Sequence, residues 1–248
     1  MIVIRECRGF DELQACVDLQ IEVWGYSDGD VIPRRVFLVA QKIGGQVIGA
    51  FDTGNREQGS GNSDEGDASS LIGFSFSLPG VKTGAKSASG RPESYLHSHM
   101  LAVRDGYRNQ SIGARLKLAQ REDALARGFT RIEWTFDPVE IKNAFLNIHK
   151  LGAIVRTYEE NFYGVSSSRL QGGLQTDRLV AELALVQSWP SEQSRIRSYR
   201  SCSPDILMLI SPQASRAMRM PEPSAPSSAS DQLSSELRTV SRGFIACW

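Results

Sequence analysis

The chain has little with which to build a metal centre or a disulfide framework, and it has no excess of charge of either sign. Its four cysteines are scattered without a Cys-x-x-Cys spacing, and it has only three histidines. These features argue against a zinc site and a disulfide-stabilised fold, and they favour a reducing compartment. Lys plus Arg equals Asp plus Glu, at 28 each, so no overall field attracts nucleic acid or an anionic membrane. We therefore expect no metal, no nucleic-acid partner and no membrane partner.

Long apolar runs and an N-terminal export signal are also missing. No apolar stretch approaches the roughly 20 residues that span a bilayer. Acidic residues in the N-terminal stretch MIVIRECRGFDE come too early for a signal peptide. We therefore expect a soluble, cytoplasmic protein, and its 248 residues allow one large domain or two small ones.

The hydrophobic pattern predicts a mixed α/β order. Residues 9–24 carry apolar side chains at steps of three and four, as an amphipathic helix does. A second helix follows the turn at 108–113, and a third covers 139–152 and ends at Gly152. Residues 36–53 are interpreted as a hairpin in which two apolar strands flank Gly44 and Gly45. The other expected strands cover 2–7, 71–80, 94–103, 130–136, 153–164 and 177–186.

Two segments have the composition of loops or extensions. Residues 54–70 are polar and glycine-rich, which predicts a flexible insertion. Beyond about residue 188 the chain is rich in Ser, Arg and Pro and has little periodicity. We therefore expect one α/β domain over 1–188 and a poorly ordered extension over 189–248, with one strand (DILMLIS) and a terminal helix.

The turn RNQSIG at 108–113 is rich in hydrogen-bonding groups and lies where a helix is expected to begin. A helix N-terminus leaves backbone N–H groups unpaired and carries about half a positive charge, which suits an anion. Gly113 has no Cβ to obstruct a ligand, and Arg108 and Arg115 supply cations for phosphate oxygens. The turn therefore suits a pyrophosphate. The alternative is an ordinary helix start, in which Ser111 is the N-cap and the arginines are solvated.

Two other phosphate-binding patterns do not fit this turn. The Walker sequence requires Gly-Lys-Ser/Thr, which is absent. The dinucleotide fingerprint requires three glycines in its first turn, where this chain has one.

RNQSIG followed by ARL resembles the Arg/Gln-x-x-Gly-x-Gly/Ala signature of the GNAT superfamily of acyl-CoA N-acyltransferases. NAFLNIHKLGA (143–153) resembles the family's later helix, and WTFDP and YEENFYG are typical of a bacterial and archaeal branch. The resemblance follows the element order from residue 1 to about residue 187. It implies a GNAT-like α/β fold, with a twisted mixed sheet flanked by helices. The acyl-CoA would lie in the cleft where strand 94–103 parts from strand 130–136.

The resemblance also implies which residues bind acetyl-CoA or another acyl-CoA. Backbone N–H groups of the turn would hold the pyrophosphate, and the preceding strand would hydrogen-bond the pantetheine arm. The cofactor-binding residues implied in this way are Leu101, Ala102, Val103, Arg108, Asn109, Gln110, Ser111, Ile112, Gly113, Ala114 and Asn143.

Two positions depart from the family pattern. The first motif glycine is Ser111, whose Cβ could crowd the phosphate and whose hydroxyl could instead donate to it. The family's frequent general-acid tyrosine corresponds to Ile148, which cannot donate a proton. Another residue or water must supply that proton.

Acyl transfer from a thioester to an amine needs a base for the amine and a proton for the departing thiolate. LHSHM puts His97 and His99 on one face of a strand that borders the expected acyl site, so both are candidate bases. The alternative for each is a structural histidine hydrogen-bonded within the sheet.

Three further residues are weaker candidates. Tyr163 could protonate the thiolate in place of the missing tyrosine, and packing in the core or in a homodimer is the alternative. His149 lies next to Ile148 but points about 100° away from it on a helix, which favours a solvated position. Asp137 could bind a substrate ammonium, although Asp-Pro after a strand is also ordinary turn chemistry.

The predicted function is direct acyl transfer from acyl-CoA to a small amine or amino acid, without an acyl-enzyme. The alternative is a module of the same fold that binds acyl-CoA without turnover or serves in protein interaction, which Ser111 and Ile148 favour.

Overall fold

The computed structural model describes residues 1–27, 29–54, 70–84, 87, 90–170, 173 and 175–185. The chain divides into two compact units, and the described residues belong to the first, Met1–Pro190 with Ile245–Trp248. Residues 55–69 of the expected insertion and all of the expected C-terminal extension lie outside the described residues. Within the described part of the chain, no helix is both long and apolar enough to cross a bilayer.

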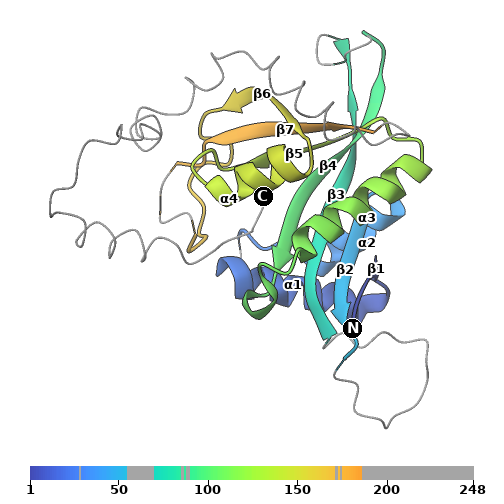
Figure 1. Cartoon of the computed structure of the whole chain (residues 1–248), viewed down its shortest axis with the longest axis vertical. Coiled ribbons are helices and arrows are strands. Elements are labelled where there is room, and N and C mark those ends of the chain that lie inside the picture. Colours follow the sequence, from blue (N-terminus) through green and yellow to red (C-terminus); the bar gives the residue numbers. More distant parts are fainter. Residues whose placement is uncertain are drawn as a thin grey trace, which may run out of the picture. The chain divides into compact units, whose positions relative to one another are not determined.

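The described residues form a seven-stranded sheet in the order β1-β2-β3-β4-β5-β7-β6, with helices on both faces (Figure 1). Neighbouring strands are antiparallel except for β4 and β5, which are parallel. The expected mixed α/β fold is confirmed. The elements in chain order are β1 (Ile2–Glu6), α1 (Gly9–Trp24), α2 (Arg34–Lys42), β2 (Gln46–Asp52), β3 (Leu71–Lys82), β4 (Glu93–Val103), a 3-10 turn (Asp105–Tyr107), α3 (Ile112–Ala126), β5 (Arg131–Phe136), α4 (Ile141–Ala144), a π-helical turn (Phe145–Lys150), β6 (Ile154–Glu159) and β7 (Arg178–Ala184).

Each face of the sheet has its own apolar core. On one face, Phe37 of α2 packs against Phe74 and Phe76 of β3, with ring centroids 5.9 and 4.8 Å apart. On the other face, Ile112 and Leu116 of α3 join a cluster of β2, β3 and β4 side chains. α4 covers the β5 end of this second face (Figure 1). The two faces are called the α1/α2 face and the α3/α4 face below.

Residues 36–53 do not form the expected hairpin, because their first half is the helix α2. In α2 the buried residues are Phe37 and Ala40, and this spacing of three is helical rather than strand-like. Pro33 stands at the N-cap, and Gly44 follows the helix with a φ of 96°. A short apolar run fits a strand and a buried helix equally, and here the flanking proline and glycine marked the helix.

The helices expected at 9–24 and 139–152 are present. The first is α1, which ends at Gly25 in the left-handed conformation. The second is α4 followed by the π-helical turn, and Gly152 beyond it has a φ of 68°. These two glycines allow the chain to turn away from the helix without a Cβ penalty.

Candidate functional site

The turn between β4 and α3 exposes a run of backbone N–H groups. Asn109 and Ser111 have φ values of 64° and 61°, in the left-handed region, and Ile112 begins the right-handed helix. A left-handed residue followed by a right-handed one turns successive N–H groups toward the same point, which suits an anion. The N–H of Arg115 donates to the carbonyl of Ser111 over 3.0 Å, so the amides of 111–114 precede the helical ladder.

Ser111 does not act as an ordinary N-cap. Its side chain makes no capping hydrogen bond, and its positive φ is the conformation that glycine adopts most readily. The backbone therefore keeps the shape of a glycine turn although the residue is serine. The alternative in which Ser111 is an ordinary N-cap is wrong, whereas Arg115 is exposed, as that alternative expected.

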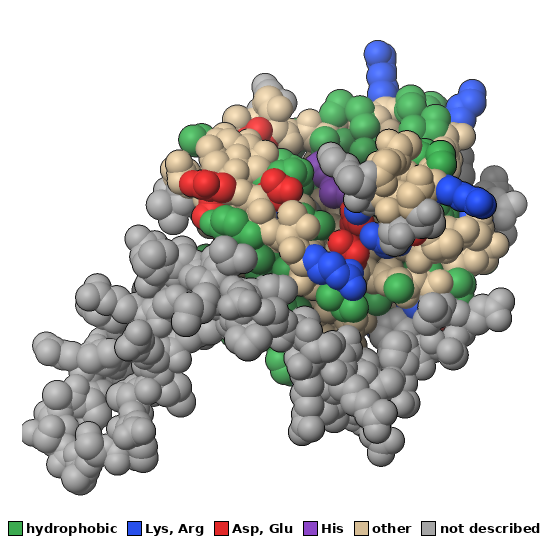
Figure 2. Space-filling model, turned by 90° about the horizontal axis from the view of Figure 1, so that it is seen from above, with side chains coloured by type: hydrophobic (Ala, Val, Ile, Leu, Met, Phe, Trp, Pro, Cys, Tyr) green, Lys and Arg blue, Asp and Glu red, His purple; other side chains and the backbone are tan. Residues whose placement is uncertain are grey.

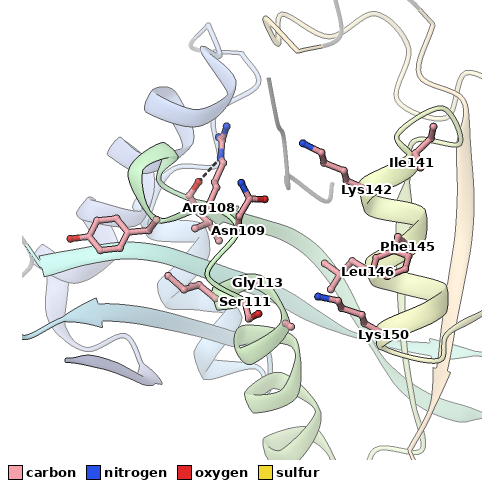
Figure 3. Close-up of a pocket in the computed structure, with 13 residues that line it drawn as sticks. Arg108, Asn109, Ser111, Gly113, Ile141, Lys142, Phe145, Leu146 and Lys150 are labelled. Atoms are coloured by element: carbon pink, nitrogen blue, oxygen red, sulfur yellow. Dashed lines mark hydrogen bonds between the residues drawn. The ribbon is translucent and has the colours of Figure 1, made fainter. Parts of the chain in front are cut away.

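The two arginines are not aimed at this turn as a phosphate clamp. Nε of Arg108 donates to the carbonyl of Val103 over 3.1 Å, and its guanidinium pairs with Asp105. The side chain extends away from Gly113 in Figure 3 and is 8% exposed. Arg115 instead donates to the carbonyl of Ile2 over 2.9 Å. Both guanidiniums fasten the turn to neighbouring backbone, so the donors that the turn offers to an anion are its amides.

A pocket of about 400 Å³ lies between this turn and α4 (Figure 3). Lys142 and Lys150, which were not among the implied cofactor-binding residues, extend from the α4 side toward the turn. They place two cationic side chains at the pocket. Seven of the implied cofactor-binding residues line the pocket: Val103, Arg108, Asn109, Ser111, Ile112, Gly113 and Ala114.

The remaining implied residues lie beside the pocket. Leu101 and Ala102 are buried in β4 next to Val103, and Asn143 is buried on α4. Gln110 is exposed, and its side-chain amide donates to the carbonyl of Gly106 over 3.3 Å. Gln110 therefore supports the turn from outside the pocket.

β4 and β5 separate close to the pocket. In the described part of the chain they pair only at Leu96 with Ile132 and at His97 with Glu133. On its other side, β4 pairs Met100 with Phe76 and Ser98 with Ser77, which leaves His99 as an extra residue in a β-bulge. Among the residues that the structure describes, the edge of β4 that faces β5 has no strand partner from Ser98 to Val103. We refer to this gap as the β4–β5 opening.

The histidines lie at this opening on the α1/α2 face. The ring centroids of His97 and His99 are 6.1 Å apart, and His99 lies 5.9 Å from Phe76. Burial is the main cause that lowers the pKa of His97 to about 4, and the charges of His99, Lys117 and Lys82 add to it. Burial also lowers the pKa of His99. Both imidazoles are therefore neutral near pH 7, as a base must be before it accepts a proton.

Tyr163 completes this group. Its ring lies 6.4 Å from that of His99, and its hydroxyl shares a hydrogen bond of 3.1 Å with Thr135 of β5. The guanidinium of Arg178, a fully buried residue, lies 5.5 Å from the centre of the tyrosine ring. Burial raises the pKa of Tyr163, so the phenol keeps its proton at neutral pH and can act as a donor.

No family model matches the sequence, and no curated protein matches it. Solved structures do match, and three of them are each 13–14% identical in sequence. Arabidopsis thaliana NAA60 in complex with acetyl-CoA has a TM-score of 0.56, covering 75% of this chain and 99% of that one. A GNAT superfamily phosphinothricin acetyltransferase from Sinorhizobium meliloti, in complex with AcCoA, has a TM-score of 0.53 over 77% and 94%. The ribosomal-protein-S18-alanine N-acetyltransferase of Escherichia coli has a TM-score of 0.51 over 77% and 98%.

The chain has the GNAT fold. At these identities the matches show a shared fold and no more. The resemblance of the sequence motifs was found without reference to these structures.

Within this GNAT fold, Tyr163 adjoins the histidine pair, whereas the other two weaker candidates, His149 and Asp137, have different surroundings. His149 is exposed and stacks on Phe145 at 4.7 Å, away from the histidine pair. Asp137 accepts a hydrogen bond of 2.9 Å from the N–H of Val139, which is the turn chemistry expected of Asp-Pro, and its carboxylate also lies 3.7 Å from the guanidinium of Arg178. Ile148 packs against the apolar cluster around Trp134.

Two loops meet next to the segment that carries Tyr163. The carboxylate of Asp30, in the connection from α1 to α2, accepts hydrogen bonds from the N–H and the hydroxyl of Ser167, over 2.7 and 2.6 Å. The N–H of Arg169 donates to the carbonyl of Trp24 over 2.9 Å. The connection from β6 to β7 is thus fastened to the end of α1. Figure 2 shows acidic and basic side chains interspersed on one face of the molecule, with a histidine reaching the surface among them.

Among the described residues, no group of three or more His, Cys, Asp or Glu side chains is arranged to hold a metal ion.

Two charged residues buried at the site, Lys117 and Arg178, were not predicted from the sequence. The helical spacing could have drawn attention to Lys117. It lies next to Leu116 and two turns before Ala124, so it belongs to the side of α3 that is buried. Nothing in the pattern of β7 distinguishes Arg178, because a charged residue that opens a strand is usually solvated.

Proposed function

We propose that the chain is an acyl-CoA-dependent N-acyltransferase acting within residues 1–188, with acetyl-CoA as the default donor. The observation that carries this proposal is the meeting of two features at one break in the sheet. The anion-binding amides of 111–114 stand at one end of the free edge of β4, and the neutral histidines stand at the other. A thioester anchored by its pyrophosphate would therefore extend toward a base.

The donor would bind along the α3/α4 face. The amides of 111–114 would hold the pyrophosphate, and Lys142 and Lys150 would neutralise its remaining charge. The unpaired edge of β4 from Ser98 to Val103 offers backbone groups to the two amides of the pantetheine arm. This arm would lie where a neighbouring strand would otherwise pair.

The chemistry would be direct transfer. The amine nitrogen attacks the thioester carbonyl, His99 or His97 accepts the proton lost by the amine, and the C–S bond breaks as the tetrahedral intermediate collapses. Tyr163 donates its phenolic proton to the departing thiolate, in place of the tyrosine that Ile148 replaces. His99 is the stronger candidate base for two reasons. Its ring adjoins that of Tyr163, and its pKa is lowered by burial, without the added effect of the lysine charges that act on His97.

The acceptor would be a small amine or amino acid. Solved neighbours include enzymes whose names give a protein alanine and phosphinothricin as acceptors, so the fold serves both classes. The hydrogen bonds from Ser167 to Asp30 and from Arg169 to Trp24 fasten the connection that carries Tyr163 to the end of α1 and the loop after it. A connection held in this way beside the proposed proton donor favours a compact acceptor over an extended chain.

A module that binds acyl-CoA without turnover is the second candidate. The observation that favours it is Ile148, which packs among apolar residues at the position of the family's proton donor. The two candidates differ in whether Tyr163 substitutes for that donor.

Thiol release from acetyl-CoA, measured against a panel of small amines, amino acids and a peptide with a free N-terminus, tests the proposal. We expect turnover with a small amine and ternary-complex kinetics. Binding of acetyl-CoA without turnover on the whole panel would favour the second candidate. Ping-pong kinetics would contradict direct transfer.

A further inference from the structure

A buried lysine closes the inner end of the β4–β5 opening. The last paired residues of the two strands are His97 and Glu133, and the next residue on each strand is Ser98 and Trp134. Nζ of Lys117, on α3, donates to Oγ of Ser98 over 2.7 Å and lies 4.1 Å from the centre of the Trp134 ring. The lysine therefore bridges the two strands at the point where their backbones cease to pair.

This bridge is enclosed by protein. Lys117 is 4% exposed, Ser98 is 2% exposed and Trp134 is fully buried. Burying an ammonium is unfavourable unless hydrogen bonds and an aromatic ring offset the loss of water, as they do here. The buried side of α3 carries both apolar and polar residues, among them Leu116, Gln120 and Arg121. Lys117 bears on the β4–β5 opening because its ammonium contacts a residue of β4 and a residue of β5 at the end of their pairing.

The length of the donor brings its thioester to this bridge. About 13 bonds separate the inner phosphorus of coenzyme A from its sulfur, which is about 16 Å at the advance of an extended chain. Five strand intervals separate Val103, which lines the pocket, from Ser98, and at about 3.3 Å each they span about 16 Å. A donor held at the pocket and extended along β4 therefore brings its acyl carbon to the point where β4 and β5 cease to pair, which is where Lys117 contacts Ser98.

We propose that Lys117 determines the acyl specificity of this site, because its side chain and the Trp134 ring together form the floor on which the acyl group rests. This inference rests on the proposed function. An acetyl group ends at this floor, and each further methylene must displace the lysine stem. A tightly packed floor resists such displacement.

Substitutions of Lys117 separate the volume of the floor from its charge. Lys117→Ala removes the stem and leaves space for a longer acyl chain. Lys117→Met keeps an unbranched stem of similar length without the ammonium, so it keeps the floor. Leu118→Ala is the matched control, because Leu118 is the next residue of α3 and points to solvent, 40% exposed.

The experiment is calorimetric binding of CoA, acetyl-CoA and butyryl-CoA to the full chain, which requires no acceptor. We expect wild type to bind acetyl-CoA more tightly than butyryl-CoA by about 10-fold or more, the discrimination typical of added methylenes. Lys117→Ala should bring this ratio to about one or reverse it. Lys117→Met and Leu118→Ala should keep the wild-type ratio.

The ratio of the affinities for acetyl-CoA and butyryl-CoA is measured on one preparation of each variant. Partial unfolding of a variant lowers both apparent affinities equally and leaves their ratio unchanged. Lys117→Val, smaller than lysine and apolar, serves in place of alanine if the latter does not fold. A wild-type ratio in the small variants, with acetyl-CoA still bound, would overturn the role of Lys117 and leave the proposed function intact. Failure of wild type to bind any of the three ligands would overturn both.

Discussion

The two faces of the sheet are built differently around the β4–β5 opening. On the α3/α4 face, the proposed anion-binding groups are backbone amides of one continuous segment, 111–114. On the α1/α2 face, the proposed catalytic groups are side chains from separate elements, namely His97 and His99 on β4 and Tyr163 beyond β6, which shares a hydrogen bond with Thr135 on β5. The first arrangement depends on local backbone shape, and the second depends on packing across the whole sheet.

This difference explains how each side tolerates change. A backbone site keeps its donors when its side chains vary, as Ser111 shows by adopting the conformation of the glycine it replaces. A side-chain site loses its function when one residue changes, because each proton carrier is a single side chain. The donor side should therefore respond to bulk and charge near the amides, and the histidine side should respond to the identity of single side chains.

The largest expected effect is on the donor side. Gly113→Glu places bulk and a negative charge where the pyrophosphate would lie, so we expect CoA affinity to fall by about 100-fold or more. Calorimetry with CoA measures it, and thermal unfolding checks that the domain remains folded. Gly106→Glu makes the same change at an exposed glycine whose added Cβ meets nothing within 4 Å, and it should bind CoA as wild type does. Equal affinity in both variants would show that the amides do not hold the coenzyme.

The next effect is on the histidine side. His99→Gln removes the proposed base but keeps a polar side chain, so kcat should fall by about 10²- to 10⁴-fold while CoA affinity is unchanged. Steady-state thiol release with the accepted amine measures kcat, and calorimetry measures affinity. His149→Gln is the control, because this histidine is exposed and stacks on Phe145 outside the site. If His99→Gln keeps wild-type kcat, His99 is structural.

Acidification should destabilise the fold through His97. Its pKa is about 4 in the folded state against 6.5 in the unfolded state, so the unfolded chain binds more protons between these values. The free energy of unfolding that His97 contributes is fully present above about pH 6.5 and is lost as the pH falls toward 4. The loss between pH 7 and pH 5 is about 2 kcal/mol. Denaturant unfolding at both pH values measures it. In His97→Gln the loss of stability on acidification should be smaller by this amount, and an identical pH dependence would contradict the assigned burial.

The smallest expected effect concerns the backbone of the turn. Ser111→Gly relieves a positive φ of 61° and breaks no capping hydrogen bond, so the free energy of unfolding should rise by about 1 kcal/mol. CoA affinity should change little, because the amides keep their positions. Ser111→Ala retains the Cβ and should not be stabilised. Destabilisation of the glycine variant in denaturant would mean that the serine side chain supports the turn.

Local patterns predicted the parts of the molecule that depend on local structure. The steps of three and four in 9–24 predicted α1, and the turn at 108–113 was identified from the N–H groups that every helix start exposes. The same reasoning failed for α2, where a short apolar run fits a helix and a strand alike. Motif resemblance predicted the fold, and the β4–β5 opening lies where that resemblance implied a cleft.

The amino-acid sequence by itself determined the helix α1, the place of the turn ahead of α3 and the presence of two histidines on one strand, since each follows from neighbours along the chain. Tertiary structure alone decided that Arg108 turns away from the pocket, that Lys142 and Lys150 face it, and that Lys117 bridges the inner end of the opening. The physical reason is that a long charged side chain can reach several partners. Only the packed fold determines which carbonyl, carboxylate or aromatic ring lies within its reach.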